Sequence, residues 1–168
     1  MSLLDYWRGT GATPPPRATL RHIALTFLGC VIAIGTVVTL SKTLTTTLLL
    51  GSFGGTCVLV FGFPEAAFSQ PRNVVFGHLL CTLVGLTFLH SFGPSAVSMT
   101  LAVATAAALM LLLGVVHPPA GGNVVISFLG KAAWSFALFP TLAGVLLIVT
   151  LALVYHGAVR HVRYPQYW

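Results

Sequence analysis

The sequence predicts an all-α membrane protein built from six helical segments. Of its 168 residues, 57% are hydrophobic and only 6% are charged, whereas soluble domains carry about 25% charged residues. Several uncharged apolar runs approach or exceed the roughly 20 residues that a helix needs to cross a bilayer. A Gly-rich pattern also recurs within the chain. This composition excludes a water-soluble enzyme, and we expect neither an enzymatic activity nor a cofactor.

Three regions follow from the composition. Residues 1–21 form an N-terminal interfacial or cytoplasmic segment, because Tyr6 and Trp7 suit the membrane interface. Residues 22–156 form a single transmembrane domain, and residues 157–168 form a cytoplasmic tail.

Polar or proline-containing breaks delimit the first three segments. The first, residues 22–40, ends at Ser41-Lys42. The second, residues 44–62, is rich in threonine and glycine and precedes a polar break at residues 64–72. The third, residues 73–91, stops at Gly93-Pro94, where the proline cannot continue a helix.

The last three segments follow the same logic. The fourth, residues 95–116, ends at a His-Pro-Pro sequence. The fifth, residues 121–130, is apolar for only ten residues before Lys131. The sixth covers residues 132–156 and is followed by Arg160 and Arg163. The second and fifth segments are therefore expected to be short or broken helices.

The positions of lysine and arginine predict the orientation. These residues lie at segment ends, so the net charge of +6 encodes topology rather than binding of nucleic acid. Six crossings place six of them on the cytoplasmic side and only Lys42 and Lys131 outside. The alternative, four spans with two re-entrant segments, moves Arg72 outside, so the excess of basic residues on the cytoplasmic side is smaller. Both arrangements put both termini in the cytoplasm, most simply beneath a bacterial inner membrane.

An internal repeat relates the two halves of the chain. Gly54-Gly55 and Gly121-Gly122 are 67 residues apart, and Gly77 and Gly144 keep this separation. Units of three segments would be inverted relative to each other, as in many transporters with Gly- and Pro-interrupted segments. Chance similarity between two Gly-rich stretches remains the alternative.

The clearest chemical motif is residues 117–123, His-Pro-Pro-Ala-Gly-Gly-Asn. The prolines end one helix, and Asn123 is expected to cap the next. A helix N-terminus attracts anions. In the matching break at residues 51–56, Ser52 or Thr56 can cap. We expect both breaks to meet near the membrane midplane; the alternative is two kinks that only help helices pack.

A third motif, residues 69–73, supplies a permanent cation. Arg72 can attract an oxyanion at a pore mouth through its planar donor fork, although it can also be a solvated loop residue. His78 and His117 can carry a proton with the anion or donate to backbone carbonyls. The candidate anion-binding residues are Ser52, Gly54, Gly55, Arg72, Asn73, His78, His117, Pro118, Pro119, Gly121, Gly122 and Asn123.

These motifs resemble the HPP family of integral membrane proteins, which is named for the His-Pro-Pro sequence. The similarity rests on residues 51–54, 70–78 and 117–121 and extends over residues 17–156. Asn123 follows Gly-Gly, where the family more usually has Gly-Ala after His-Pro-Pro. The resemblance implies four membrane spans, against the six expected above, and, from the plant members, transport of nitrite.

Motifs and resemblance together predict a transporter or channel for a small inorganic anion, most simply nitrite. Six histidines leave open a haem- or metal-binding redox protein, although His78 and His90 are about 18 Å apart along one helix. A non-transporting assembly partner is a third possibility. The expected partners are the anion, the lipid bilayer and, on size alone, further copies of the chain; we expect no metal and no nucleic acid.

Overall fold

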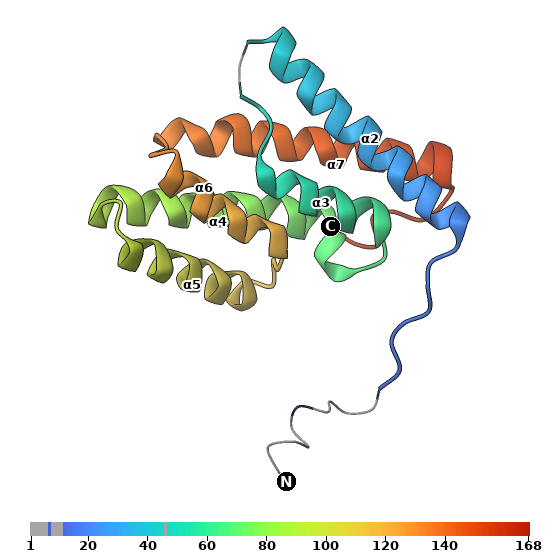
Figure 1. The fold of residues 1–168 in the computed structure, drawn as a ribbon, viewed down its shortest axis with the longest axis horizontal. Coiled ribbons are helices and arrows are strands. Elements are labelled where there is room, and N and C mark those ends of the chain that lie inside the picture. Colours follow the sequence, from blue (N-terminus) through green and yellow to red (C-terminus); the bar gives the residue numbers. More distant parts are fainter. Residues whose placement is uncertain (1–6, 8–11, 46) are drawn as a thin grey trace.

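The structure, a computed structural model, describes residue 7, residues 12–45 and residues 47–168. Within these residues it contains six α-helices, labelled α2 to α7, and no strand (Figure 1). The predicted all-α class is therefore confirmed. Part of the expected interfacial segment, residues 1–6 and 8–11, lies outside the described residues.

Three helical stretches are long and apolar enough to span a membrane. They are α2 (Leu20–Thr43), α4 (Pro71–Phe92) and the stretch Trp134–Arg160, which contains α7 (Ala143–Tyr155). Helix α5 (Ala96–Leu112) is shorter. As predicted, the second and fifth segments form the shortest helices, α3 (Gly51–Gly62) with 12 residues and α6 (Gly121–Leu129) with 9.

Three predicted segments differ from the observed helices. The second was expected to begin at residue 44, but α3 begins only at Gly51. The sixth was expected to be continuous, but it begins with a 3-10 turn (Trp134–Ala137) and a kinked stretch (Leu138–Leu142), in which Phe139 is extended, before α7. Pro140 lies in this stretch and has no N–H to donate, so the α-helical ladder starts only after it. At the other end, a π turn (His156–Arg160) extends the helix. Helix α5 stops at Leu112, two residues before Gly114, whose φ of +63° is readily adopted by glycine.

Successive helices alternate in direction, so α2 begins at the end of the bundle where the π turn after α7 finishes (Figure 1). Arg160 Nη2 donates to His22 Nδ1 across 3.1 Å, which joins these two ends directly. An even number of passes through the bundle produces this arrangement, as the six-segment prediction requires.

Two glycine contacts have the spacing of the predicted repeat. A Cβ on Gly77 would lie 3.1 Å from the Val115 carbonyl oxygen, and a Cβ on Gly144 would lie 3.3 Å from the Leu48 carbonyl oxygen. Both the glycines and their partners are 67 residues apart. Helices α4 and α7 therefore approach equivalent backbone through equivalent glycines; a repeat over the whole of both units remains a prediction.

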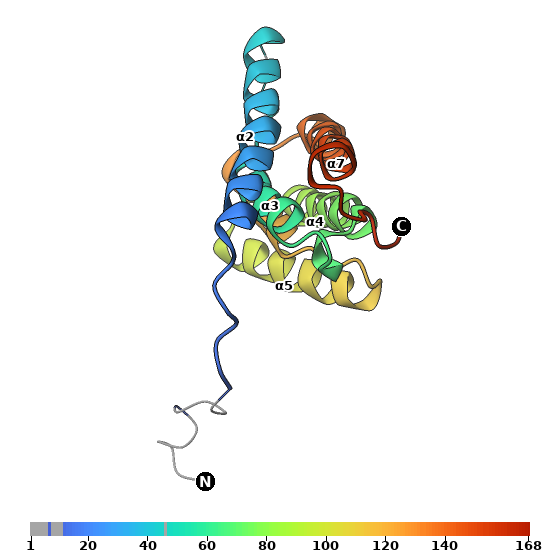
Figure 2. The same ribbon diagram turned by 90° about the vertical axis from the view of Figure 1, so that its right-hand side faces the viewer.

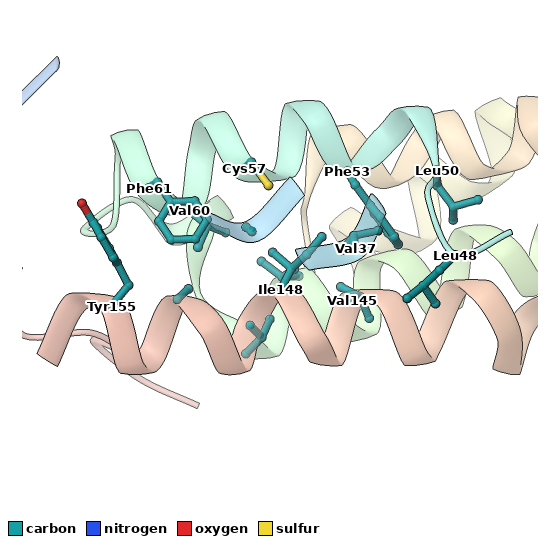
Figure 3. Packing of buried hydrophobic residues seen from close by; sticks show 14 of the residues in the cluster. Val37, Leu48, Leu50, Phe53, Cys57, Val60, Phe61, Val145, Ile148 and Tyr155 are labelled. Carbon is teal, nitrogen blue, oxygen red and sulfur yellow. The ribbon is translucent and has the colours of Figure 1, made fainter. Parts of the chain in front are cut away.

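Whereas helix α4 contacts α5, α6 and α7, helix α3 packs against α2, α6 and α7 (Figure 2). Its apolar face packs on α7, where Phe53 and Phe61 meet Val145 and Ile148 (Figure 3). A second apolar cluster joins α4, α5 and α6. Large apolar side chains such as Phe27 and Val31 of α2 are exposed. In an integral membrane protein such side chains face lipid.

Candidate functional site

Seven polar side chains are buried together between α3, α4, α6 and the start of α7, and we call them the polar core. Each is at most 8% exposed. A buried polar group is costly unless it is hydrogen-bonded, so this concentration in an otherwise apolar bundle requires an explanation. The members are Ser52, Thr56, His78, Thr82, His117, Asn123 and Thr141.

Helical spacing aligns these side chains. Ser52 and Thr56 lie four residues apart on α3, and His78 and Thr82 lie four residues apart on α4, so each pair shares one face of its helix. Gly85 continues the face of α4, where a Cβ would lie only 3.0 Å from Val124 Cα of α6. The glycine therefore allows α4 and α6 to approach closely enough for their polar side chains to meet.

A threonine hydroxyl joins the two histidines. Thr56 Oγ1 lies 2.9 Å from His78 Nε2 and 2.9 Å from His117 Nε2. The imidazole centroids are 5.1 Å apart. On its other side, His117 Nδ1 lies 2.6 Å from the Phe68 carbonyl oxygen, which can only accept, so Nδ1 carries a hydrogen.

Asn123 joins the remaining members. Ser52 Oγ donates to Asn123 Oδ1 at 2.6 Å, and Asn123 Nδ2 donates to Thr82 Oγ1 at 2.9 Å. The Thr82 hydroxyl lies 3.3 Å from that of Thr141. Thr56 Oγ1 also lies 3.1 Å from the Ser52 carbonyl oxygen. An unbroken series of polar contacts therefore runs from Phe68, in the 3-10 turn Ala67–Ser69, to Thr141.

Two polar atoms at the site have no partner. His78 Nδ1 and Asn73 Oδ1 are buried and make no hydrogen bond within the part of the chain that the structure describes. The Asn73 amide nitrogen does donate, to the Val116 carbonyl at 3.2 Å. Such orphan atoms are rare in native proteins and often mark functional positions.

The two breaks in the helices meet. Gly55 approaches Pro119 so closely that a Cβ on the glycine would lie 3.2 Å from Pro119 Cγ, and a Cβ on Gly122 would lie 3.6 Å from Ser52 Cβ. The predicted residues Ser52, His78, His117 and Asn123 all belong to the polar core, and Asn73 lies five residues before His78 on α4. Three others point away from it: Gly54 and Gly121 face open space, and Pro118 is exposed.

Arg72 lies apart from the polar core. Its guanidinium donates to the Gly114 carbonyl at 2.7 Å and to the Leu113 carbonyl at 3.3 Å. These carbonyls follow the last turn of α5, where a cation is favourable. Through these two hydrogen bonds, Arg72 holds the start of α4 against the end of α5.

The expected caps of the two short helices were wrong. Helix α6 follows directly from the 3-10 turn Pro118–Ala120, so its N-cap is Ala120 and Asn123 lies inside the first turn. Helix α3 has Leu50 at its N-cap. Neither N-cap makes a side-chain hydrogen bond, because leucine and alanine have no polar side-chain group. The Ser52, Thr56 and Asn123 side chains bind one another or His78, His117 and Thr82.

Sequence reasoning missed three parts of the site. Thr56 was considered only as a cap, and its spacing of four residues from Ser52 was the available signal. Thr82 has the same spacing from His78. Thr141 follows Pro140 in a run that was read as plain apolar helix, and nothing in its local sequence points to the core.

The C-terminal residues close one end of the bundle. Tyr164 Oη donates to the Ser69 carbonyl at 2.8 Å, and the Gln166 backbone N–H donates to Gln70 Oε1 at 2.7 Å. The Tyr164 ring packs on His156, with centroids 4.8 Å apart. Burial raises the pKa of Tyr164 above its ordinary value, so the hydroxyl remains a donor. This segment therefore holds the 3-10 turn whose Phe68 carbonyl binds His117.

Comparison with known proteins decides the family. The family model described as "HPP, transmembrane region" matches residues 15–165, nearly the whole chain. The chain belongs to the HPP family. The motifs that suggested HPP membership supply Ser52, His78 and His117 of the polar core, and they also supply Arg72, which lies apart from it.

Two relatives from Dictyostelium discoideum are described only as transmembrane proteins. Each is 31% identical to this chain, over 184 and 174 aligned residues, which cover 100% and 96% of it. The chain spans only 65% and 56% of their lengths. No solved structure matches the chain.

Proposed function

We propose that this HPP protein is a transporter or channel for a small inorganic anion. The observation that carries the proposal is the polar core, an uncharged series of hydrogen-bonding groups buried in the middle of a membrane bundle. Both chain breaks contribute to it, which is how transporters with interrupted helices build their binding sites. Polar groups inside membrane proteins are functional candidates by default because they are costly to keep there.

The chemistry of the polar core favours an anion over a cation. Its hydroxyls, its amide N–H and its imidazole N–H groups can all donate to an oxyanion. None of its members is a carboxylate. The acidic residues of the chain are Asp5 and Glu65, and Glu65 is exposed in the loop after α3. An anion at the core would therefore meet no buried carboxylate.

The core is closed in this conformation, because its members contact one another directly. Transport then requires a second conformation in which an anion replaces some of these contacts. The Gly55–Pro119 contact joins the two breaks, so a movement of one break relative to the other would change it. Arg72, partly exposed at the end of α5, would attract the anion toward the bundle.

Nitrite is the first substrate to test, because the resemblance of the motifs to plant HPP proteins implies it. We further propose that both termini face the cytoplasm beneath a bacterial inner membrane. The clustering of Arg17, Arg21, Arg160 and Arg163 at the joined ends of the bundle supports this orientation.

An anion panel in vesicles containing the purified protein tests the proposal. We expect nitrite or a similar oxyanion to enter faster than into protein-free vesicles. Asn123→Asp should lower this flux about tenfold or more, because a buried carboxylate repels the anion by more than 1.4 kcal/mol. Ser52 and Thr82 can still donate to the new carboxylate, so the fold should survive.

Gln166→Glu is the matched control, because it makes the same amide-to-carboxylate change in the C-terminal segment outside the core. It should leave the flux unchanged. A folded wild-type protein that passes no anion of the panel would overturn the proposal. It would favour the non-transporting assembly partner, for which the exposed apolar surface of α2 is the supporting observation.

The haem alternative gains no support from the positions of the histidines. His78 and His117 share one hydroxyl with centroids 5.1 Å apart, which leaves no room for a porphyrin between them. His90 lies 3.0 Å from the Ala132 carbonyl, and His156 lies 2.9 Å from the Val60 carbonyl. No group of three or more potential metal-binding side chains occurs within the described residues.

A further inference from the structure

We propose that His117, Thr56 and His78 form a binding site for one proton that is carried together with the anion. The inference rests on the proposed function and specifies that transport of the anion is coupled to transport of a proton. It follows from counting the hydrogens available for three contacts. His117 Nδ1 contacts the Phe68 carbonyl, and the Thr56 hydroxyl contacts both His117 Nε2 and His78 Nε2.

With both histidines neutral, only one arrangement satisfies these three contacts. His117 Nδ1 must donate to the Phe68 carbonyl, so His117 Nε2 is bare and accepts the single hydrogen of Thr56. Thr56 Oγ1 then accepts from His78 Nε2. This assignment leaves His78 Nδ1 as a bare lone pair, and the structure shows that nitrogen buried without a partner.

One extra proton reverses the direction of this relay. The proton binds His78 Nδ1, His78 passes its Nε2 hydrogen to Thr56 Oγ1, and Thr56 passes its own hydrogen to His117 Nε2. His117 then carries hydrogens on both nitrogens, and His78 Nε2 accepts from Thr56. Three N–H or O–H bonds form, two break, and nothing is oxidised or reduced.

The Thr56 hydroxyl has one further acceptor within reach. The Ser52 carbonyl oxygen lies 3.1 Å from it. Thr56 donates there only when both Nε2 atoms carry hydrogens, which again requires a doubly protonated His117. Meeting every observed contact at the same time therefore needs one proton more than the neutral pair supplies.

In the reversed relay, where the extra proton is on His78 Nδ1, the orphan nitrogen becomes a donor instead of an acceptor; in the arrangement with Thr56 bonded to the Ser52 carbonyl it stays bare. A bare Nδ1 lone pair repels an anion, whereas an Nδ1–H can donate to one. Proton and anion also neutralise each other, which lowers the cost of burying either charge. The anion is therefore admitted only with the proton, and the protein acts as a one-to-one symporter of a proton and a small anion.

The other titratable or charged groups on the packed elements have contacts of their own. On α4, Arg72 binds the carbonyls after α5, Cys81 Sγ donates to Met110 Sδ at 3.6 Å, and His90 contacts the Ala132 carbonyl. Tyr155 of α7 donates to the Leu25 carbonyl. His156 and Arg160 contact carbonyls of α3, and Cys57 of α3 belongs to the apolar cluster. Helices α5 and α6 and the turns Ala67–Ser69, Pro118–Ala120 and Leu138–Leu142 carry no such group.

Nitrite accumulation in vesicles tests the coupling. With a gradient of one pH unit, alkaline inside, one-to-one symport should concentrate nitrite up to about tenfold, after subtraction of the signal from protein-free vesicles. Thr56→Val removes the hydroxyl at nearly constant shape and should abolish this pH-driven accumulation. Thr87→Val is the matched control, because the exposed Thr87 hydroxyl bonds only to Leu83 within α4, and accumulation should persist.

Nitrogen NMR of histidine-labelled wild-type protein in bilayers gives a second measurement that needs no variant. Between about pH 8 and about pH 5, where histidine titrates, nitrite should shift His78 Nδ1 from the bare to the protonated signal. Two rings that stay neutral over this range with nitrite present would overturn the inference. Nitrite flux that ignores the pH gradient would also overturn it and leave anion transport intact, whereas absence of any flux would overturn the proposed function itself.

Discussion

At the scale of single residues, a side chain that the sequence predicts to bind a ligand can also hold two helices together in the fold. Arg72 was expected to attract an oxyanion, and in the structure its guanidinium also donates to the Gly114 and Leu113 carbonyls. Its partners lie 42 and 41 residues away. Because these partners are distant in the sequence, the residues around Arg72 indicate its charge but not the groups that it binds.

Gly77 is the residue whose replacement should disturb the site most directly. A Cβ there would lie 2.9 Å from His117 Cβ and 3.1 Å from the Val115 carbonyl oxygen. Gly77→Val should therefore destabilise the protein by about 1–3 kcal/mol or displace His117, since overpacking forces neighbouring backbone to move. Thermal unfolding in detergent measures the loss.

Gly35→Val is the matched control for Gly77→Val. Gly35 lies on α2 with no atom within 4 Å of an added Cβ. This change should leave stability within about 0.5 kcal/mol of the wild type, as for most surface substitutions. Equal stability of the two variants would mean that α4 and the His-Pro-Pro break are not packed as described.

At the scale of elements, the pattern of apolar runs and breaks predicted the helices well and their side-chain partners poorly. Proline, glycine and charged residues mark where helices stop, so the sequence predicts that α3 and α6 are short. Asn123 was placed at the right break with the wrong role, because its partners Ser52 and Thr82 are 71 and 41 residues away. Thr141 was missed for the same reason.

The C-terminal segment makes a prediction about alkaline stability. The raised pKa of Tyr164 means that the folded protein keeps the phenol proton after the unfolded chain has lost it, above about pH 10. The stability linked to this group is therefore fully present below that pH and falls as the pH rises further. Tyr164→Phe should remove this contribution to the loss of folding stability at alkaline pH.

The measurement for Tyr164 is the unfolding temperature of both proteins from about pH 8 to above about pH 10. Removing the hydrogen bond to Ser69 should also cost about 1 kcal/mol at neutral pH. Tyr167→Phe is the control, because Tyr167 is exposed and its bond to the Ala67 carbonyl is long, at 3.3 Å. An identical alkaline decline in wild type and Tyr164→Phe would contradict the assignment.

At the scale of the whole molecule, charge and packing agree on a bundle with two distinct ends. Arg160 meets His22 at one end. Lys42, in the last turn of α2, lies at the opposite end of that helix. Six passes require the loop containing Glu65 to lie at the arginine-rich end, and it lies there in the structure, because Tyr164 and Gln166 bond to Ser69 and Gln70 directly after this loop. Four spans with re-entrant segments would require this loop at the Lys42 end.

Cysteine accessibility decides between these topologies. Cys30, Cys57 and Cys81 are first replaced by alanine, and Glu65→Cys, Lys42→Cys and Arg163→Cys are made singly, all at exposed positions. In sealed vesicles of one orientation, a membrane-impermeant thiol reagent should label positions 65 and 163 from the same side and position 42 from the other. Labelling of position 65 together with position 42 would establish the four-span arrangement. It would also place the Phe68 end of the polar core on the same membrane side as Lys42, so that the core could not connect opposite faces of the bilayer.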